Sequence, residues 1–292
     1  MKILAYILQK RVKTHFRMTG RRMRDIDNFY KILIKHMKGQ NNMTAICHEI
    51  CQNERKESME RVYCTAIVLA GGSGKRMGTS VHKQYLLMAG KPVLYYSLKA
   101  FQDSELIDEI ILVTGAGEET YCRETIVDRY SLSKVSKIIP GGAERYLSVW
   151  NGLQQTENEG YIFIHDGARP FVNTDMIRRG YECADANEAC VAAMPVKDTI
   201  KIVDHDHSVK ATPDRSTVWQ VQTPQIFQSK LVKNAYKKLI EEKIENATDD
   251  AMVVETMSNH PVKVFEGSYL NLKITTPEDL EIAEVFLKKE GK

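Results

Sequence analysis

A glycine-rich segment that carries two cations follows the first strongly apolar run of the sequence. After residues 66–69 (Ala-Ile-Val-Leu), the chain continues with Ala70, Gly71, Gly72, Ser73, Gly74, Lys75 and Arg76. A turn with few side chains exposes backbone N–H groups to phosphate oxygens, and Lys75 and Arg76 add positive charge. The segment therefore predicts a phosphate-binding site. The alternative is a tight turn between a strand and a helix that binds no ligand.

The spacing within this segment excludes two common nucleotide-binding motifs. The ATPase phosphate loop has Ser or Thr directly after its Lys, whereas Arg76 follows Lys75 here. The dinucleotide-binding fingerprint has a third Gly or an Ala, and Met77 occupies that position. The loop therefore indicates neither an ATPase of that kind nor a nicotinamide-dependent dehydrogenase.

Further groups of polar and charged residues follow the loop. They are Lys83-Gln84-Tyr85-Leu86, Gly90-Lys91-Pro92-Val93-Leu94, Gly141-Gly142-Ala143-Glu144-Arg145, His165-Asp166-Gly167-Ala168-Arg169-Pro170, Val196–Lys201, Gln222-Thr223-Pro224-Gln225, Thr248-Asp249-Asp250 and Asn271–Thr275. In this order, the loop and these motifs resemble the 2-C-methyl-D-erythritol 4-phosphate cytidylyltransferase family of sugar-phosphate nucleotidyltransferases. The resemblance runs from about residue 62 to 288. It departs at His82, where the family often has proline, and we expect that change to loosen the turn before Lys83.

The resemblance implies that residues 61–292 transfer CMP from CTP to 2-C-methyl-D-erythritol 4-phosphate, with release of pyrophosphate, in the non-mevalonate isoprenoid pathway. A phosphate monoester is largely dianionic near pH 7, because its second pKa is about 6, so such an acceptor needs no general base. The difficulty is that two anions must meet, which cations and fixed N–H donors relieve. Mg²⁺ that bridges the CTP phosphates is the implied cofactor. Because Mg²⁺ keeps several waters, no set of protein metal ligands is expected.

The resemblance also assigns roles to individual positions. Arg76 and Lys83 would neutralise the triphosphate, and Arg215 and Lys273 would hold the acceptor phosphate for in-line attack. The predicted nucleotide-binding residues are Ala70, Gly71, Gly72, Ser73, Gly74, Lys75, Gly142, Arg145, Ser148 and Asp166. The predicted acceptor-binding residues are Asp166, Arg169, Thr199 and Thr223. The alternative interpretations are a solvated surface charge for each lone cation, a helix cap for Asp166 and ordinary strand residues for the threonines.

Apolar runs that alternate with helical patterns predict the scaffold from Val62 onward. The expected strands are Thr65–Leu69, Glu109–Thr114, Val135–Ile139, Tyr161–His165 and Cys190–Met194, and the expected helices are Pro92–Phe101, Glu118–Tyr130, Ala143–Gln155 and Thr174–Ala186. This alternation predicts an α/β fold with a Rossmann-like, mostly parallel twisted sheet and helices on both faces. Asp166 would lie just past a strand end, where open α/β sheets bind ligands.

The alternation breaks after Pro195. Thr199–Val203 and Val209–Thr212 predict two short strands of a protruding antiparallel β-arm at about residues 195–220. In the family this arm crosses a two-fold axis, so the resemblance implies a homodimer with arm exchange. The tail predicts helices near Gln228–Glu242 and Asp249–Met257, a strand at Val262–Phe265 and a final helix that opens at Thr276-Pro277.

Residues 1–60 form a basic N-terminal extension without a family counterpart. Residues 1–58 carry 13 Lys and Arg against 5 Asp and Glu, although the net charge of the whole chain is +3. One interpretation is basic helices that dock on nucleic acid, an anionic membrane or the following domain. The favoured interpretation is a poorly ordered extension, or leader sequence upstream of a start near Met59.

Cysteine usage and hydropathy indicate a cytoplasmic protein without a membrane span. The six cysteines show no regular framework and are interpreted as reduced thiols. No run approaches the roughly 18 to 20 apolar residues that a span requires. Metal binding at Cys47, His48 and Cys51, or at His205 and His207, is disfavoured, because no second pair follows at zinc spacing and the two histidines lie in a polar turn.

Two other functions fit parts of the sequence. A ribitol- or pentitol-5-phosphate cytidylyltransferase would share the loop, the Lys83 region and Gln222–Gln225, so only its acceptor pocket would differ. Gly167 and Ala168 favour methylerythritol phosphate. A non-catalytic protein that binds nucleic acid or lipid through residues 1–58 is disfavoured, because the four predicted catalytic cations are all retained. No nucleic-acid partner is therefore expected.

Overall fold

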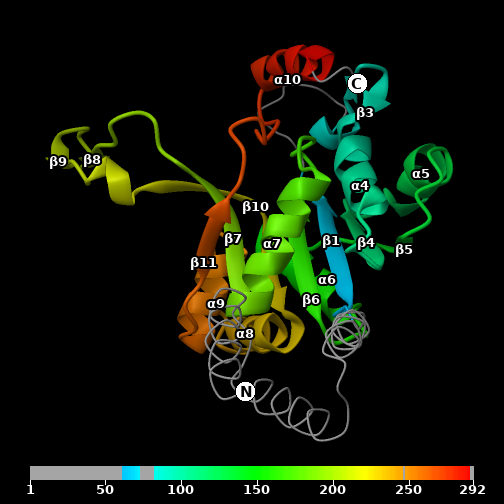
Figure 1. The fold of residues 1–292 in the computed structure, drawn as a ribbon, viewed down its shortest axis with the longest axis horizontal. Helices are drawn as coiled ribbons and strands as arrows, with labels where there is room; N and C mark the ends of the chain where they lie inside the picture. Colours follow the sequence, from blue (N-terminus) through cyan, green and yellow to red (C-terminus); the bar gives the residue numbers. More distant parts are fainter. Residues whose placement is uncertain (1–60, 73–81, 246, 290–292) are drawn as a thin grey trace, which may run out of the picture. The chain divides into compact units, whose positions relative to one another are not determined.

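A seven-stranded sheet forms the centre of the described chain, and helices cover it (Figure 1). The structure is a computed structural model that describes residues 61–72, 82–245 and 247–289. Within these residues, neighbouring strands pair in parallel except β10, which runs antiparallel to β6 and β7. In spatial order, the strands are β11 (Lys263–Glu266), β7 (Ala189–Pro195), β10 (Trp219–Gln228), β6 (Tyr161–Asp166), β1 (Cys64–Ala70), β4 (Glu109–Thr114) and β5 (Val135–Pro140).

The strands predicted from apolar runs are confirmed, and β1 shows the reason. Ala66 and Val68 belong to the core on one face of the sheet, whereas Ile67 belongs to the core on the other face. All three side chains are fully buried. A strand buried on both faces is a continuous apolar run in the sequence, so it is easily recognised. The predicted α/β class with a mostly parallel sheet is confirmed.

Strand β10 was not expected from the sequence. Polar residues and Pro224 interrupt its apolar pattern, and a proline lacks the N–H that a sheet ladder requires. The structure accommodates Pro224 where the pairing of β10 with β7 shifts register between Val221 and Gln225. The Thr223–Pro224 peptide bond is cis. The Gln222–Gln225 motif thereby lies in the middle of the sheet, beside the end of β6.

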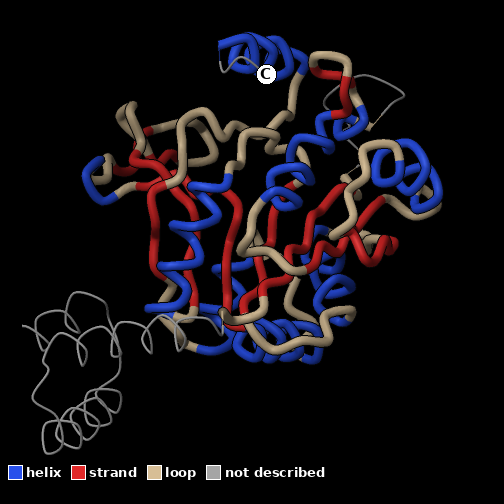
Figure 2. Tube along the Cα trace, turned by 45° about the vertical axis from the view of Figure 1, so that its right-hand side comes forward, coloured by secondary structure: helices blue, strands red, loops and turns tan. Residues whose placement is uncertain are grey.

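Two layers of helices cover the sheet (Figure 2). One core cluster lies under α4 (Val93–Asp103), α7 (Thr174–Asn187) and the short α5 (Glu119–Cys122), which continues as a π-helical turn (Arg123–Asp128). The other lies under α6 (Arg145–Gln154), α8 (Ser229–Glu241) and α9 (Asp250–Ser258). The predicted helices on both faces are therefore confirmed, although the segment Glu118–Tyr130 is not one regular α-helix.

The predicted antiparallel arm projects from the sheet (Figure 1). It contains the hairpin strands β8 (Ile202–Val203) and β9 (Val209–Ala211) and a 3₁₀ turn at Arg215–Thr217. The apolar side chains of the hairpin are about half exposed: 52% for Ile202, 47% for Val203 and 58% for Val209. A two-stranded ribbon of this size has little core of its own.

A C-terminal helix links two loops of the domain. The helix α10 (Pro277–Lys289) packs against Met88 in the hairpin of β2 (Leu87–Met88) and β3 (Lys91–Pro92), and against Ile274. These loops also carry Lys83 and Lys273, so one small core supports both. None of the described helices has the length and apolar character needed to cross a bilayer. The predictions for residues 1–60 lie outside the described residues, as do those for Ser73, Gly74, Lys75 and Arg76.

Candidate functional site

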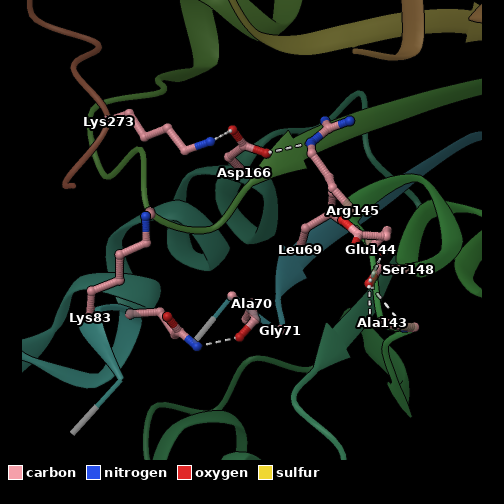
Figure 3. Close-up of a pocket in the computed structure, with 14 residues that line it drawn as sticks. Leu69, Ala70, Gly71, Lys83, Ala143, Glu144, Arg145, Ser148, Asp166 and Lys273 are labelled. Carbon is pink, nitrogen blue, oxygen red and sulfur yellow. Dashed lines mark hydrogen bonds and ion pairs between the residues drawn. The ribbon is translucent and has the colours of Figure 1, made fainter. Parts of the chain in front are cut away.

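A cavity of about 350 Å³ opens beyond the carboxyl ends of β1 and β6. In open α/β sheets, ligands bind outside the carboxyl ends of the strands, at the point where successive strands are added on the opposite side of the first strand. That switch occurs here at β1, which lies between β4 and β6. The described lining residues are Leu69, Ala70, Gly71, Gly72, Lys83, Gln84, Gly142, Ala143, Glu144, Arg145, Ser148, Asp166, Ala168 and Lys273 (Figure 3).

Glycines let the backbone approach closely at two edges of this cavity. A Cβ atom on Gly71 would lie 3.0 Å from the carbonyl oxygen of Thr114, at the end of β4. A Cβ atom on Gly142 would lie 2.4 Å from the Cβ atom of Leu147. The Gly142 N–H donates to Ser148 Oγ over 3.0 Å, so the hydroxyl of α6 fixes the turn that precedes the helix. One cavity is therefore lined by five of the residues that were predicted to bind the nucleotide: Ala70, Gly71, Gly72, Gly142 and Ser148.

Asp166 forms ion pairs with two cations of the site. Its Oδ2 atom lies 2.8 Å from Lys273 Nζ, and its Oδ1 atom lies 3.3 Å from Arg145 Nε. Burial disfavours the ionised carboxyl, but Arg145 and Lys273 outweigh that effect and hold the pKa of Asp166 well below its usual range. Asp166 is therefore a buried carboxylate that holds one cation on each side.

Arg145 is also held from behind by a second carboxylate. Its two terminal nitrogens donate to the two oxygens of Asp250 over 2.9 and 2.8 Å. Asp250 is fully buried and also accepts a 2.6 Å hydrogen bond from the Tyr236 hydroxyl. Burial opposes the charge on Arg145, but Asp250 and Asp166 raise the pKa of its guanidinium well above the usual value. The side chain is thus held in one position by bidentate geometry.

A second cavity of about 390 Å³ adjoins the first. The two cavities share Arg145, Asp166 and Lys273, so Asp166 stands at their junction. The other described residues that line the second cavity are Arg169, Val221, Gln222, Thr223, Gln225, Thr248 and Asp249. The Thr223 hydroxyl accepts the Asp166 N–H over 3.0 Å, which ties β10 to the end of β6. Two joined cavities with cations at their boundary suit two anionic ligands that must meet.

Lys83 and Lys273 lie on one side of the first cavity, and Arg145 lies on the other side (Figure 3). The 3₁₀ turn Lys83–Tyr85 is fixed at both of its later residues. Gln84 Nε2 donates to the carbonyl oxygen of Ala70, and the Tyr85 hydroxyl donates to Glu118 over 2.7 Å. Lys83 lines the first cavity from this fixed turn (Figure 3).

His82 contacts the residue that anchors the Lys83 turn. Its Nδ1 atom lies 2.6 Å from Glu118 Oε1. The same Glu118 side chain accepts from the Gly115 N–H over 3.1 Å. These contacts do not test whether the turn is looser than with proline, so the expectation that His82 loosens the turn stays a prediction.

Two predicted residues lie away from both cavities. Thr199 and Arg215 are exposed on the arm and are not among the described residues that line either cavity. Arg215 donates to the backbone oxygen of Lys197 over 2.9 Å. Their assignment to the acceptor stays a prediction that requires a surface beyond this chain's own cavities.

Sequence analysis missed the support behind Arg145. Asp250 and Gln225 lie in motifs that were recognised, but no role was assigned to them. Gln225 accepts from the N–H groups of Asp250 and Ala251, which holds the start of α9 against β10. The repeated acidic residues before an apolar helix were the available signal. No such signal marked Tyr236, because a tyrosine in an amphipathic helix usually packs in the hydrophobic core.

Comparison with known proteins gives one consistent result. A family model described as IspD, 2-C-methyl-D-erythritol 4-phosphate cytidylyltransferase, matches residues 64–289. A protein of that name from Lachnospira eligens is 54% identical over 225 residues, which are 77% of this chain and 99% of the relative. One from Lachnoclostridium phytofermentans is 47% identical over 231 residues, 79% of this chain and 98% of the relative. The crystal structure of 4-diphosphocytidyl-2C-methyl-D-erythritol synthase from Anaerococcus prevotii has a TM-score of 0.69 at 33% identity and covers 78% of this chain and 100% of that chain.

Proposed function

The chain belongs to the 2-C-methyl-D-erythritol 4-phosphate cytidylyltransferase family, and we propose that its two joined cavities hold the two substrates of that family's reaction. The enzyme transfers CMP from CTP to 2-C-methyl-D-erythritol 4-phosphate and releases pyrophosphate, a step of isoprenoid precursor synthesis. The observation that supports this use of the cavities is the position of Asp166, at their junction between Arg145 and Lys273. The relatives do not favour the ribitol phosphate alternative.

CTP occupies the first cavity in this proposal. The backbone of Ala70–Gly72 and the Gly142 turn approach the nucleotide, and Lys83 neutralises its phosphates together with Arg76 of the preceding loop. The reaction needs no general base, because the attacking phosphate is already ionised near pH 7. Negative charge grows on the α-phosphate oxygens and on the departing pyrophosphate. Fixed cations that meet this charge can each contribute a few kcal/mol, so positioning and charge provide the catalysis.

The acceptor phosphate occupies the second cavity. Lys273 lines both cavities, and Arg169 lines the second, so these cations can draw the acceptor towards the α-phosphate. Asp166 keeps Lys273 and Arg145 apart and ordered before substrate binds, which avoids reorganisation during the reaction. The Thr223 hydroxyl is already used inside the protein, so Thr223 supports this cavity chiefly by holding the Asp166 backbone.

Mg²⁺ is the inferred cofactor, bound mainly by the CTP phosphates and water. The donor set fits this use. Of the described residues that line the first cavity, Glu144 and Asp166 carry carboxylates, which supply the oxygen ligands that Mg²⁺ prefers. Mg²⁺ commonly binds to one or two carboxylates plus substrate phosphates. When bound, it would supply further neutralisation of the triphosphate.

A homodimer completes the proposed site. The arm exposes apolar side chains and presents Arg215 and Thr199 to solvent, away from the cavities of its own chain. An exposed apolar ribbon is a common interaction surface, and a two-fold dimer would place each arm on the partner. Arg215 of one chain would then contact the acceptor phosphate of the other. A cytoplasmic location is inferred because both substrates are charged metabolites that do not cross bilayers.

Pyrophosphate release with CTP and Mg²⁺ tests the proposal. Methylerythritol phosphate should support turnover, and ribitol 5-phosphate should not. Lys83→Ala should lower kcat/KM by about 100-fold or more, as expected for loss of a transition-state cation. Lys91→Ala is the matched control, because Lys91 is an exposed cation of the adjoining hairpin that packs on Tyr95. No turnover with methylerythritol phosphate, or equal effects of the two substitutions, would contradict the assignment.

A further inference from the structure

His165 lies directly behind the second cavity and lines neither of the two cavities described above. The side chain is fully buried and packs edge-on against Phe101, with 5.2 Å between ring centroids. Its Nδ1 atom lies 3.0 Å from the Thr223 hydroxyl, and its Nε2 atom lies 3.1 Å from the backbone oxygen of Arg169. The imidazole therefore connects strand β10 to the turn that carries Arg169.

The direction of these hydrogen bonds follows from the partners. A carbonyl oxygen can only accept, so the proton must be on Nε2, which donates to Arg169. In the neutral ring Nδ1 then accepts from the Thr223 hydroxyl, whose oxygen in turn accepts the Asp166 N–H. Burial lowers the pKa of His165 to about 4, which keeps the ring neutral near pH 7. Each of the three hydrogen bonds that run from the Asp166 N–H through Thr223 and His165 to the Arg169 oxygen thereby joins one donor to one acceptor.

The same network continues to the loop that carries Lys273. Arg169 Nη1 donates to the backbone oxygen of Asn271 over 2.8 Å, and Asn271 Nδ2 donates to the backbone oxygen of Thr223 over 2.9 Å. His165, Arg169, Asn271 and Thr223 thus form a closed ring of contacts. Ser97 on α4 adds a hydroxyl 3.0 Å from the Arg169 oxygen. Four segments that are distant in sequence are held together behind one cavity.

We propose that His165 is a positioning residue for the acceptor, acting through the backbone of Arg169 and the hydroxyl of Thr223. This inference rests on the proposed assignment of the second cavity to the acceptor. Arg169 and Thr223 line that cavity but not the first, whereas the Gly142 turn and Ser148 of the first cavity have separate supports. Loss of the imidazole should therefore disturb acceptor use more than CTP binding. A merely structural residue would affect both substrates alike.

Two substitutions separate the two bonds of the imidazole. In His165→Gln, the longer amide can still donate to the Arg169 oxygen. In His165→Asn, the shorter amide reaches only the Thr223 hydroxyl, for which its oxygen replaces Nδ1 as the acceptor. The hydrogen bond to the Arg169 oxygen is lost. Phe163→Leu is the matched control, because Phe163 is fully buried two residues earlier on β6 and belongs to a core cluster rather than to this network. Its substitution costs packing without removing a hydrogen bond.

The measurement is steady-state kinetics on the full-length chain, with both substrates varied. The proposal predicts that His165→Asn raises KM for methylerythritol phosphate about tenfold while KM for CTP changes less than about twofold, and that His165→Gln recovers most of the loss. Phe163→Leu should not show this split. Equal changes in both KM values, or no recovery by Gln, would overturn the proposal. A wild-type enzyme without turnover would instead overturn the proposed function.

Nitrogen-15 NMR of the wild-type protein gives a test that does not depend on folding of a variant. We expect the His165 ring to be neutral with its proton on Nε2, and unchanged between pH 6 and 8. Nuclear Overhauser contacts between the His165 and Phe101 rings, whose centroids lie 5.2 Å apart, assign the signal in the wild-type protein. A ring that titrates in this range, or that carries its proton on Nδ1, would contradict the hydrogen-bond direction on which the proposal depends.

Discussion

The surroundings of Asp166 and the β-arm represent opposite ways of presenting charge. Asp166 is 8% exposed and holds Arg145 and Lys273 by direct ion pairs, and Arg145 is held again by Asp250. Arg215 on the arm is exposed and donates to the backbone oxygen of Lys197. The first region has its geometry fixed within one chain. Among the described residues, Arg215 of the second region lines neither of the two cavities.

The difference indicates a site made of two parts. Charges around Asp166 are preorganised, so they can stabilise a transition state without movement of the protein. The arm supplies charge on an extended ribbon, which becomes ordered around a ligand only when another surface supports it. Substitutions in the first region should therefore alter stability and activity together. Substitutions on the arm should alter activity alone.

Removal of Asp250 should give the largest effect on stability. Asp250 is fully buried, and Asp250→Ala leaves the partly exposed Arg145 guanidinium without its bidentate partner; breaking a buried ion pair costs about 3–5 kcal/mol. Urea unfolding measures the loss. The exposed pair of Lys99 and Asp103 is the control, because Lys99→Ala should cost about 0–1 kcal/mol. Similar losses for both variants would contradict the view that the Asp166 region is rigidly preformed.

Asp166→Asn should give the largest effect on activity. The amide cannot hold Lys273 and Arg145 by ion pairs, so the cations at the boundary of the cavities lose their fixed positions. We expect kcat/KM for methylerythritol phosphate to fall about 100- to 1,000-fold, the range seen when a preorganised electrostatic group is lost. Pyrophosphate release measures the change. A loss below about threefold would show that Asp166 does not organise the reacting groups.

Arg215→Ala should give a smaller effect, restricted to the acceptor. Loss of a charge-assisted contact to phosphate costs about 1.5–3 kcal/mol, equivalent to about a 10- to 100-fold decrease in kcat/KM for the acceptor. The free energy of unfolding of the chain should remain within about 0.5 kcal/mol, because Arg215 is an exposed surface residue. Lys210→Ala, which removes another exposed cation of the arm, should leave kcat/KM unchanged. Equal effects of the two substitutions on kcat/KM would contradict the assignment of Arg215 to the acceptor-binding site.

A dependence of stability on pH should originate from His165. Burial lowers its pKa to about 4 in the folded state, whereas the unfolded value is about 6.5. Above pH 6.5 both states are neutral, so His165 has no effect there. Between pH 6.5 and 4 the unfolded chain gains the proton first, and stability falls by about 2 kcal/mol between pH 7 and 5. Asp166, Arg169 and Lys273 face this ring, and the lowered pKa of Asp166 acts only below about pH 4.

Urea unfolding of the wild-type protein and of His165→Gln at pH 7 and 5 measures this contribution. Glutamine does not titrate, so the variant should show a flatter pH dependence whatever its stability at pH 7. Equal slopes for the two proteins would contradict a neutral, buried His165.

The sequence predicted those parts of the molecule whose chemistry is local. The strand β1 is an apolar run, and Asp166 comes two residues after the apolar run Tyr161–Ile164, so both positions could be recognised. β10 could not, because Pro224 and its polar neighbours resemble a loop until the sheet surrounds them. Asp250 could not be paired with Arg145, since the two are 105 residues apart and only the fold brings them together. Local patterns therefore predicted the elements, whereas long-range contacts determine the site.

Subunit complementation tests the two-part site most directly. Asp166→Asn and Arg215→Ala chains, each at least about tenfold less active than the wild-type chain, would be coexpressed with different affinity tags, and the mixed dimer would be purified with both tags. If the arm of each chain serves the partner's cavities, one of the two sites carries both substitutions and the other carries neither, so activity should return to roughly half that of the wild-type enzyme. If each arm serves its own chain, both sites are defective and the mixed dimer should be no more active than its Arg215→Ala parent. That result, or the absence of any mixed dimer, would contradict the account.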